Sequence, residues 1–502
     1  PGFQIHRADT KRGLGQGGTN ILINGSRVSG KSTDPMEVLG RTSNASVVRV
    51  EIVEGASLGI SGLSGPVANV IIDNTERTGN WEWNGQFRKG LPARWTNGSI
   101  SVSDKIGNVS YTLALDNDAF RSGAWGPEFV TGPDGELIAT RYEQARNVGE
   151  NPKVSLVLGH KDNVGREANF NASYTVFDFN GRFLSDSDFV DPSEPATFER
   201  FPREEDEWNT EVSGDYAFDA FGGRLKLIVF QYLEDSDFIN ESFVENDNGF
   251  VRAERFLRNI YEGESILRAE QTWMLGEERS FELAAEGVYN FVDTESSFFT
   301  LDEQGTETEV DLSGANTKIE ERRAEISGTY NFSFGEKLST QTSLVIEYSE
   351  LEQSGDSANA RTFTRPKGFL SASYDLTESL ELRGQIEREV GQLDFFAFAS
   401  SVDLQNGNDR AGNAELVPEQ SWNYEFAIEK TFADDSQVTL SFEYRDIEDV
   451  VQRVPFLITD SDTGNRFKVE GIGNVPEATR WRVRLQGTQM LDRFGIQGGR
   501  LV

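Results

Sequence analysis

The residues with the clearest capacity for chemistry lie near the start of the chain, in the stretch NILINGSRVSGKST, residues 20–33. Residues 25–32 match the spacing G-x-x-x-x-G-K-[ST], in which backbone N–H groups and a lysine hold the phosphates of a nucleotide. A second stretch, VANVIID, ends in Asp73, a carboxylate of the kind that binds Mg²⁺ in such sites. Taken alone, these residues would predict a nucleotide-binding site.

The elements around this match do not fit a nucleotide site. A phosphate-binding loop needs a helix of several turns directly after the lysine, because the helix N-terminus forms part of the phosphate cradle. Here Asp34 and Pro35 follow, and the next residues, MEVLGR, suffice only for a short helix. Nucleotide hydrolases also alternate strands with helices, whereas the chain shows almost no helical periodicity after Asp73. We therefore interpret Asn24-Gly25 as a tight turn.

No other group of reactive side chains points to catalysis. The chain has no cysteine, and its two histidines, His6 and His160, lie far apart in the sequence. These counts exclude disulfides and thiolate metal sites, and they argue against a metal site built on imidazoles. Two loop carboxylates could hydrolyse a glycosidic bond, but among 83 acidic residues such pairs carry no information. We expect no catalytic residues, no cofactor and no enzymatic activity.

Composition narrows the class of protein further. Acidic residues outnumber basic ones, 83 to 48, in a chain of 502 residues with a formal net charge of −35. A nucleic acid partner is not expected, because phosphate binding requires a basic face. No run of 18 apolar residues is present to form a transmembrane helix. The chain begins with Pro1 and ends in Gly-Gly-Arg-Leu-Val, so we expect a fragment that lacks both termini.

From about residue 80 onward, apolar and polar residues alternate with a period of two, which is the signal of strands with one apolar face. Residues 169–177 and 437–445 show this alternation clearly. Each such segment has about ten residues, the length of a tilted strand that crosses a membrane. Short turns alternate with long polar connections along this region, as they do in outer-membrane barrels. The expected long loops are residues 118–152, 178–206, 236–263, 293–317, 351–365, 390–419 and 448–478.

These patterns predict a mainly β protein, a transmembrane antiparallel barrel with about 17 strands in this chain and about 22 in the full protein. Trp208, Trp422 and Trp481 stand where strands begin after long loops, and we expect them in an aromatic girdle at the outer interface. The alternate faces of the strands carry polar residues, so the lumen must hold water or a polar plug. We expect two domains, a partial α+β plug at residues 1–79 and a partial barrel at residues 80–502.

The sequence also resembles a known family. ADTKRGLGQGGTNILINGSRVSGKS and VVRVEIVEGASLGISGLSGPVANVIID are similar to the plug of TonB-dependent outer-membrane receptors, and NAELVPEQSWNYEFAIEKTF is similar to the barrel signature of that family. Plug arginines in this family pair with glutamates of the barrel, which implies such contacts for Arg12 and Arg49. The chain departs from the family pattern at Glu54, where an arginine is common, and this puts the usual pairs in doubt.

The resemblance implies energised import across the outer membrane of a Gram-negative bacterium. A monomeric receptor would bind a scarce small ligand from outside, and TonB with its inner-membrane complex would shift the plug. The ligand class stays open between siderophore–iron, cobalamin, oligosaccharide and similar molecules. Phe395, Phe396 and Phe398 in a long loop are candidates for contact with a ring-bearing ligand, although loop aromatics more often pack against their neighbours. The alternatives are a passive porin or surface-binding barrel and a soluble β-rich binding protein.

Overall fold

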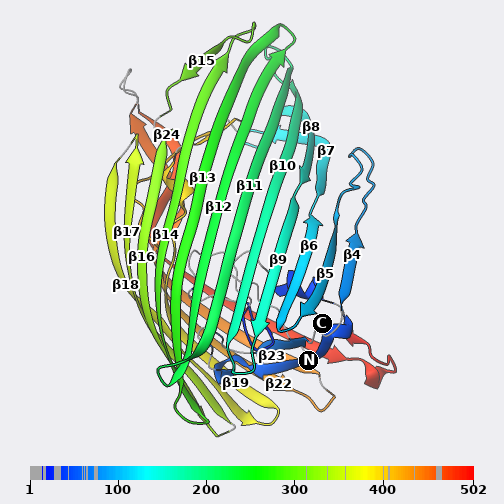
Figure 1. The fold of residues 1–502 in the computed structure, drawn as a ribbon. Coiled ribbons are helices and arrows are strands. Elements are labelled where there is room, and N and C mark those ends of the chain that lie inside the picture. Colours follow the sequence, from blue (N-terminus) through cyan, green and yellow to red (C-terminus); the bar gives the residue numbers. More distant parts are fainter. Residues whose placement is uncertain are drawn as a thin grey trace.

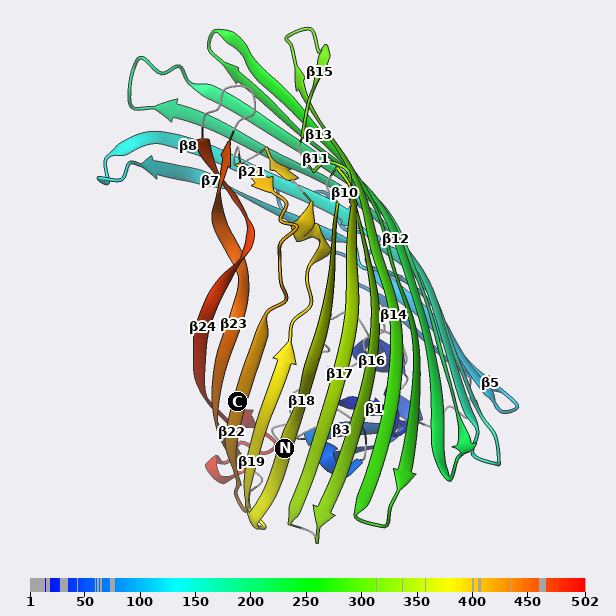
Figure 2. The same ribbon diagram turned by 90° about the vertical axis from the view of Figure 1, so that its left-hand side faces the viewer.

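The computed structural model describes residues 14, 19–27, 35–42, 44–58, 60, 63, 66–72, 77–312, 314–335, 337–356, 358–399, 401–404, 408–434, 436–459 and 466–501. A small N-terminal domain lies within the lower part of a large rolled β-sheet (Figures 1 and 2). Within these residues there is no helix with the length and hydropathy needed to cross a membrane.

The N-terminal domain is a three-stranded sheet with one short helix. Its strands are β1 (Ile21–Ile23), β2 (Val47–Glu54) and β3 (Pro66–Ile72), in the order β1-β3-β2, and its helix is α1 (Pro35–Arg41). β1 runs parallel to β3, and β2 runs antiparallel to it. Burial of Leu22, Leu63 and Val67 provides its small apolar core.

The wall of the rolled sheet is antiparallel, and its neighbouring strands follow each other in the sequence. The wall strands are β4 (Thr78–Trp83), β5 (Gly98–Ile106), β6 (Val109–Asn117), β9 (Pro152–Lys161), β10 (Glu167–Phe189), β11 (Thr197–Ala220), β12 (Gly223–Asn246), β13 (Gly249–Met274), β14 (Arg279–Leu301), β16 (Thr317–Phe334), β17 (Leu338–Gly355), β18 (Asn359–Thr377), β19 (Leu380–Val390), β22 (Gln420–Thr431), β23 (Gln437–Thr459) and β24 (Arg466–Met490). This set is close to the about 17 strands that the sequence predicts.

Further strands complete the sheet. They are β7 (Phe120–Thr131), β8 (Leu137–Glu150), β15 (Glu307–Val310), β20 (Ser401–Asp403), β21 (Asn408–Ala411) and β25 (Arg500–Leu501). The strand order closes into a barrel between β25 and β4. For this seam, the described residues give no residue-by-residue pairing. A mainly β barrel with a small α+β domain in its lumen is confirmed.

The expected strand length of about ten residues is wrong for much of the wall. β13 has 26 residues and β24 has 25, because most of the expected long loops continue the strands as paired hairpins. In the expected loop 178–206, β10 stays paired with β11 from Asp178↔Asp206 to Ser187↔Thr197. In this extension the outward face is mostly polar, as Asp178, Asn180 and Arg182 show, and apolar residues such as Phe183 lie on the inward face. The signal of an apolar lipid-facing side therefore ends although the backbone pairing persists. The alternation of short turns and long connections remains.

The two faces of the wall have opposite character. On β17, Leu344, Ile346 and Tyr348 point outward and are 73%, 63% and 47% exposed, whereas Ser343, Glu347 and Ser349 between and beside them point inward and are buried. A soluble protein would bury the apolar set. An apolar outer band around a polar interior is the arrangement that lipid requires of a spanning barrel.

The three predicted interface tryptophans lie on this outer face. Trp422 and Trp481 are 41% and 70% exposed, and Trp208 stacks on Tyr174 with ring centroids 6.3 Å apart. Tyr444 lies between Tyr424 and Trp481 in the strand registers, so aromatic rings line up across β22, β23 and β24. Amphipathic rings of this kind favour the boundary between lipid and water.

Candidate functional site

The stretch that matches a phosphate-binding loop begins with a reverse turn. Asn24 and Gly25 both have positive φ, 53° and 78°, and the backbones of Ile23 and Ser26 hydrogen-bond each other across them at 3.0 and 3.1 Å. The N–H of Gly25 donates to Asn69 Oδ1 at 2.8 Å, so this donor is already used within the domain. Lys31, Ser32 and Asp73 lie outside the described residues. The predicted tight turn is confirmed.

Arg41, the last residue of α1, attaches the N-terminal domain to the barrel wall. Its guanidinium donates to Asp116 Oδ2 of β6 at 2.5 Å and to Ser155 Oγ of β9 at 3.0 Å, and it also pairs with Glu37 of its own helix. Lys153 of β9 lies 3.4 Å from Glu37. The Arg41 side chain is only 8% exposed, so these charges attract each other with little screening by solvent.

A second cation of the domain, Arg27, lies near the part of the wall formed by β13 and β14. Burial lowers the pKa of its guanidinium, and the carboxylates of Glu270 on β13 and Glu282 on β14 oppose that shift. The interface also uses main-chain groups. The N–H of Leu14 donates to Glu286 Oε2 at 3.2 Å, and Gln341 Nε2 donates to the carbonyl of Ile60 at 3.1 Å.

Of the two arginines singled out from the sequence, only Arg49 is among the described residues. Arg49 lies on the exposed side of β2, and its Nε donates to Glu51 Oε1 of the same strand at 2.6 Å. Arg12 and the side chain of Glu54 lie outside the described residues. Among the described residues, the contact with the wall that the resemblance implies for Arg49 is therefore made by Arg41, which the sequence reasoning missed.

The inner wall around the domain carries buried ion pairs that cross neighbouring strands. Glu286 on β14 is 4% exposed and accepts from Arg268 of β13 and Arg323 of β16, each at 3.3 Å. Lys367 of β18 lies 2.6 Å from Glu325 and 2.7 Å from Glu347. Because each ion has a partner of opposite sign, this polar lumen avoids the cost of isolated buried charge.

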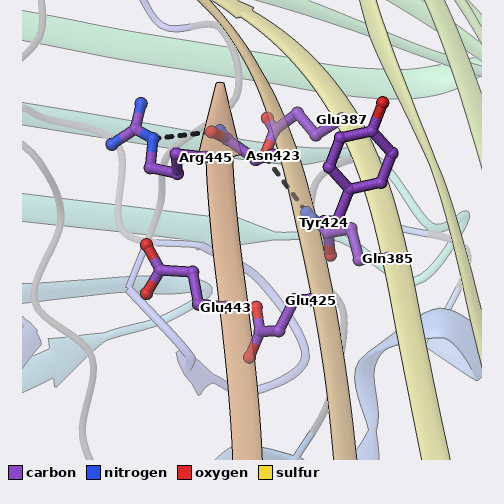
Figure 3. A pocket seen from close by; sticks show the side chains of 7 residues that line it. All are labelled: Gln385, Glu387, Asn423, Tyr424, Glu425, Glu443 and Arg445. Atoms are coloured by element: carbon purple, nitrogen blue, oxygen red, sulfur yellow. Dashed lines mark hydrogen bonds between the residues drawn. The ribbon is translucent and has the colours of Figure 1, made fainter. Parts of the chain in front are cut away.

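A polar pocket of about 230 Å³ opens in the inner wall formed by β19, β22 and β23 (Figure 3). Its lining residues are Gln385, Glu387, Asn423, Tyr424, Glu425, Glu443 and Arg445. Arg445 Nε donates to Asn423 Oδ1 at 2.6 Å, and its Nη2 donates to Glu389 Oε2 at 2.8 Å. Glu443 pairs with Arg480 of β24 at 2.6 Å.

The chemistry of this pocket favours ligands that donate hydrogen bonds. Three of its residues are glutamates and one is an arginine that already donates to Asn423 and Glu389, so carboxylates outnumber cations in the lining. Its volume is below the range of roughly 300–1,000 Å³ of drug-sized sites. The pocket therefore suits one hydroxyl- or amine-bearing group of a larger molecule.

The three candidate phenylalanines form a 3₁₀ turn, η3 (Phe395–Phe398), which packs onto the inner wall. Phe395 and Phe398 are 5% and 3% exposed, whereas Phe396 is 41% exposed. The buried pair belongs to an apolar cluster with lumen-facing residues of β13, β14, β16 and β17, namely Ile260, Val292, Ile319 and Leu351, together with Leu393 and Leu416. Two of the three rings thus pack against neighbours, and Phe396 is the ring left at the surface.

Hydrogen bonds hold this inner segment at both sides. Arg361 Nη1 of β18 donates to the carbonyl of Leu416 at 2.8 Å, and Asn474 Nδ2 of β24 donates to that of Val417 at 2.8 Å. The N–H of Val417 returns a bond to Asn474 Oδ1 at 2.9 Å. Residues 391–399 and 412–419 therefore form an internal strap across the upper lumen. In the described part of the chain, no three His, Asp or Glu side chains gather as metal ligands would.

Comparisons with known proteins agree with this architecture. The sequence profile of the family described as TonB dependent receptor-like, beta-barrel matches residues 155–499. The fold is similar to that of the copper transporter OprC, with a TM-score of 0.54 and 14% identity over 98% of this chain and 72% of that one. It is also similar to a double mutant of the Serratia marcescens hemophore receptor HasR in complex with its hemophore HasA and heme.

For HasR, the TM-score is 0.50 and the identity is 11% over 93% of this chain and 71% of that one. At these identities the likeness shows the fold alone. No curated protein sequence matches the chain. The family match covers more than half of the chain, and the architecture is that of a barrel with a domain inside it. The chain therefore belongs to the TonB-dependent receptor-like β-barrel family.

Proposed function

We propose that this protein imports a scarce small ligand across the outer membrane of a Gram-negative bacterium, with energy delivered through TonB. The observation that carries the proposal is the N-terminal domain seated in the lumen of a barrel whose outer band is apolar. A domain in that place blocks free passage, so transport requires that it move. Family membership supports ligand uptake, and it supplies the expectation that TonB drives the movement.

The contacts between domain and wall suit a plug that is held but releasable. Arg41 joins Asp116 and Ser155 of two adjacent strands, so a pull on the domain would break these contacts together. Buried pairs such as Arg323 and Glu286 lie within the wall and would remain when the plug moves. Movement would therefore expose a lumen that is still electrically balanced.

The ligand is proposed from the surface that remains accessible above the plug. The glutamate-rich pocket favours a ligand rich in hydroxyl or amine groups, and Phe396 offers an exposed ring to an apolar or aromatic part. The compared structures are described as a copper transporter and a hemophore receptor with heme. Siderophore–iron, cobalamin and oligosaccharides are the classes to be tested for this chain. A monomer is the expected functional unit.

Growth on defined nutrients tests this function. A deletion strain would receive ferric siderophore, heme, cobalamin or a defined oligosaccharide as the single source of iron, cofactor or carbon, in hosts with and without TonB. The proposal predicts that the gene restores growth on one source only where TonB is present. Restoration on the same source without TonB would contradict energised import and would favour a passive porin.

A further inference from the structure

The connection between β4 and β5 has a charge opposite to that of the protein as a whole. Residues 83–103 contain no aspartate or glutamate and three basic residues, Arg88, Lys89 and Arg94. The complete chain carries a formal net charge of −35. Two carboxylates contact the end of this connection that leads into β5, Glu150 through Thr96 and Asp118 through Asn97. Arg88 and Lys89 have no ion pair among the described residues, so they attract anions locally even though the long-range field is negative, because salt screens charges beyond about 8–10 Å.

Aromatic rings gather on the same connection. The ring centroids of Phe87 and Trp95 are 4.6 Å apart in an edge-to-face arrangement, and those of Trp83 and Trp95 are 6.2 Å apart and stacked. These three side chains remain 60%, 59% and 54% exposed for Phe87, Trp95 and Trp83. These three rings touch and leave half of their surface open, so they form a larger aromatic surface than the single stacked pair of Trp208 and Tyr174 in the girdle.

The loop is held in a defined conformation. Gln86 and Arg94 hydrogen-bond each other's backbone at 3.0 and 2.9 Å, which closes the loop at its base. Arg88 donates to the carbonyl of Arg121 on β7, and Arg94 donates to the carbonyl of Ala119 at 3.2 Å. Each guanidinium has five N–H donors, so donors remain on both. Lys89 is exposed and has no ion pair or hydrogen bond among the described residues.

The position of the loop places this surface beside the lipid. Trp83 shares the outward face of the wall with Ile100 and Leu115, which are 59% and 56% exposed. The loop lies at the end of the wall opposite the short β5–β6 turn, and it ends well below the tips of the β10–β13 hairpins (Figure 1). It therefore stands at the rim of the apolar band rather than at the mouth of the lumen.

We propose that residues 83–95 bind the phosphorylated sugar headgroup of lipid A in the outer leaflet. Arg88 and Lys89 would contact the phosphates, since guanidinium and ammonium groups are the usual partners of phosphate. The exposed faces of Phe87 and Trp95 would pack against the apolar faces of the sugar rings. Trp83, at the end of β4 and closer to the apolar band than the loop, would lie at the boundary between headgroups and acyl chains. Tryptophan favours this depth in a membrane. This site is separate from the lumen, so its test does not depend on ligand uptake.

The test measures binding of lipid A and of its dephosphorylated form to the full-length, delipidated protein in detergent by native mass spectrometry. The phosphorylated form is expected to bind about thirtyfold more tightly, which corresponds to roughly 1 kcal/mol for each of Arg88 and Lys89 near an anionic headgroup. Lys89→Gln and the double variant with Arg88→Gln should reduce that preference. The control Lys105→Gln removes an exposed cation near the opposite end of β5 and should leave the preference unchanged.

Two results would overturn the proposal. Equal binding of the two lipids by the wild-type protein would show that the headgroup phosphates are not recognised, even if Phe87→Ala weakened both, and the rings would then be an ordinary interfacial belt. If Lys105→Gln and Lys89→Gln reduced the preference for the phosphorylated lipid equally, the preference would be a general effect of charge and not the property of a site. Lys89→Gln is the decisive variant, because within the described part of the chain Lys89 has no hydrogen bond or ion pair whose loss could unfold the loop.

Discussion

At the scale of single residues, the attachment of the plug depends on which arginine side chain contacts the barrel wall. The position of an arginine in the sequence does not reveal this contact. Arg49 matches the family pattern but lies on the exposed side of β2, where Glu51 is its nearest partner. Arg41 has no motif around it, yet the end of α1 brings it to residues 75 and 114 positions later in the chain. Such distant contacts could not be predicted from one sequence, because they depend on how the domain is seated in the barrel.

The two arginines form a matched pair for a test of plug retention. Arg41→Gln should weaken the attachment, because Asp116 and Glu37 lose the buried cation between them, at a cost of about 3–5 kcal/mol for breaking a buried pair. Arg49→Gln removes an exposed pair, whose loss costs little. Protease cleavage of the plug in the folded barrel measures the difference. Equal cleavage of both variants would contradict the role of Arg41.

Glu51 gives a prediction about pH at the same scale. The hydrogen bond from Arg49 holds the pKa of the Glu51 carboxyl below its ordinary value. A lowered pKa means that the pair stabilises the domain above the ordinary pKa of glutamate, about 4.3, and that this stabilisation is lost as pH falls through the lower folded value. An NMR titration of Glu51 should show a midpoint that rises in Arg49→Gln. An unchanged midpoint would mean that Arg49 does not hold the charge.

At the scale of elements, the sequence predicted the type of strand better than its length. The period-two pattern requires an apolar face against lipid, so it reports only the part of each strand inside the membrane. β10 and β11 continue their pairing through residues whose outward face is mostly polar and whose inward face holds Phe183 and Phe201, so no apolar outer face marks that part. The tight turn at Asn24-Gly25 was predictable because its two positive φ values restrict the residue types that fit.

The internal strap is the element whose role the sequence left open. Phe398→Ala should loosen residues 391–399, because it removes a ring that is 3% exposed from the cluster with Ile319 and Leu351, a loss of about 3–5 kcal/mol. Phe396→Ala, a change at an exposed ring of the same turn, is the control. Hydrogen exchange of these residues in the empty receptor measures the loosening. Similar protection in both variants would show that the cluster does not hold the strap.

At the scale of the whole molecule, the apolar side chains lie on the outside of the barrel and the polar ones inside. This distribution suits a barrel surrounded by lipid. Leu344→Arg places a cation in the apolar outer band of β17 and should destabilise the membrane-inserted barrel by about 2–4 kcal/mol. Glu350→Arg changes the same outward face of the same strand beyond that band, where a cation costs about 0–1 kcal/mol. Urea unfolding in lipid vesicles compares the two. Comparable losses of stability would contradict a lipid-facing band.

The central claim is that a plug closes this barrel until it is moved. Conductance of the full-length protein in a planar lipid bilayer tests it most directly. The account predicts that the wild-type protein inserts without a steady current and that Arg41→Gln, in which the plug is less firmly held, shows channel openings. A steady, porin-like current through the wild-type protein would contradict the account, because a lumen filled by the N-terminal domain cannot conduct as an open pore.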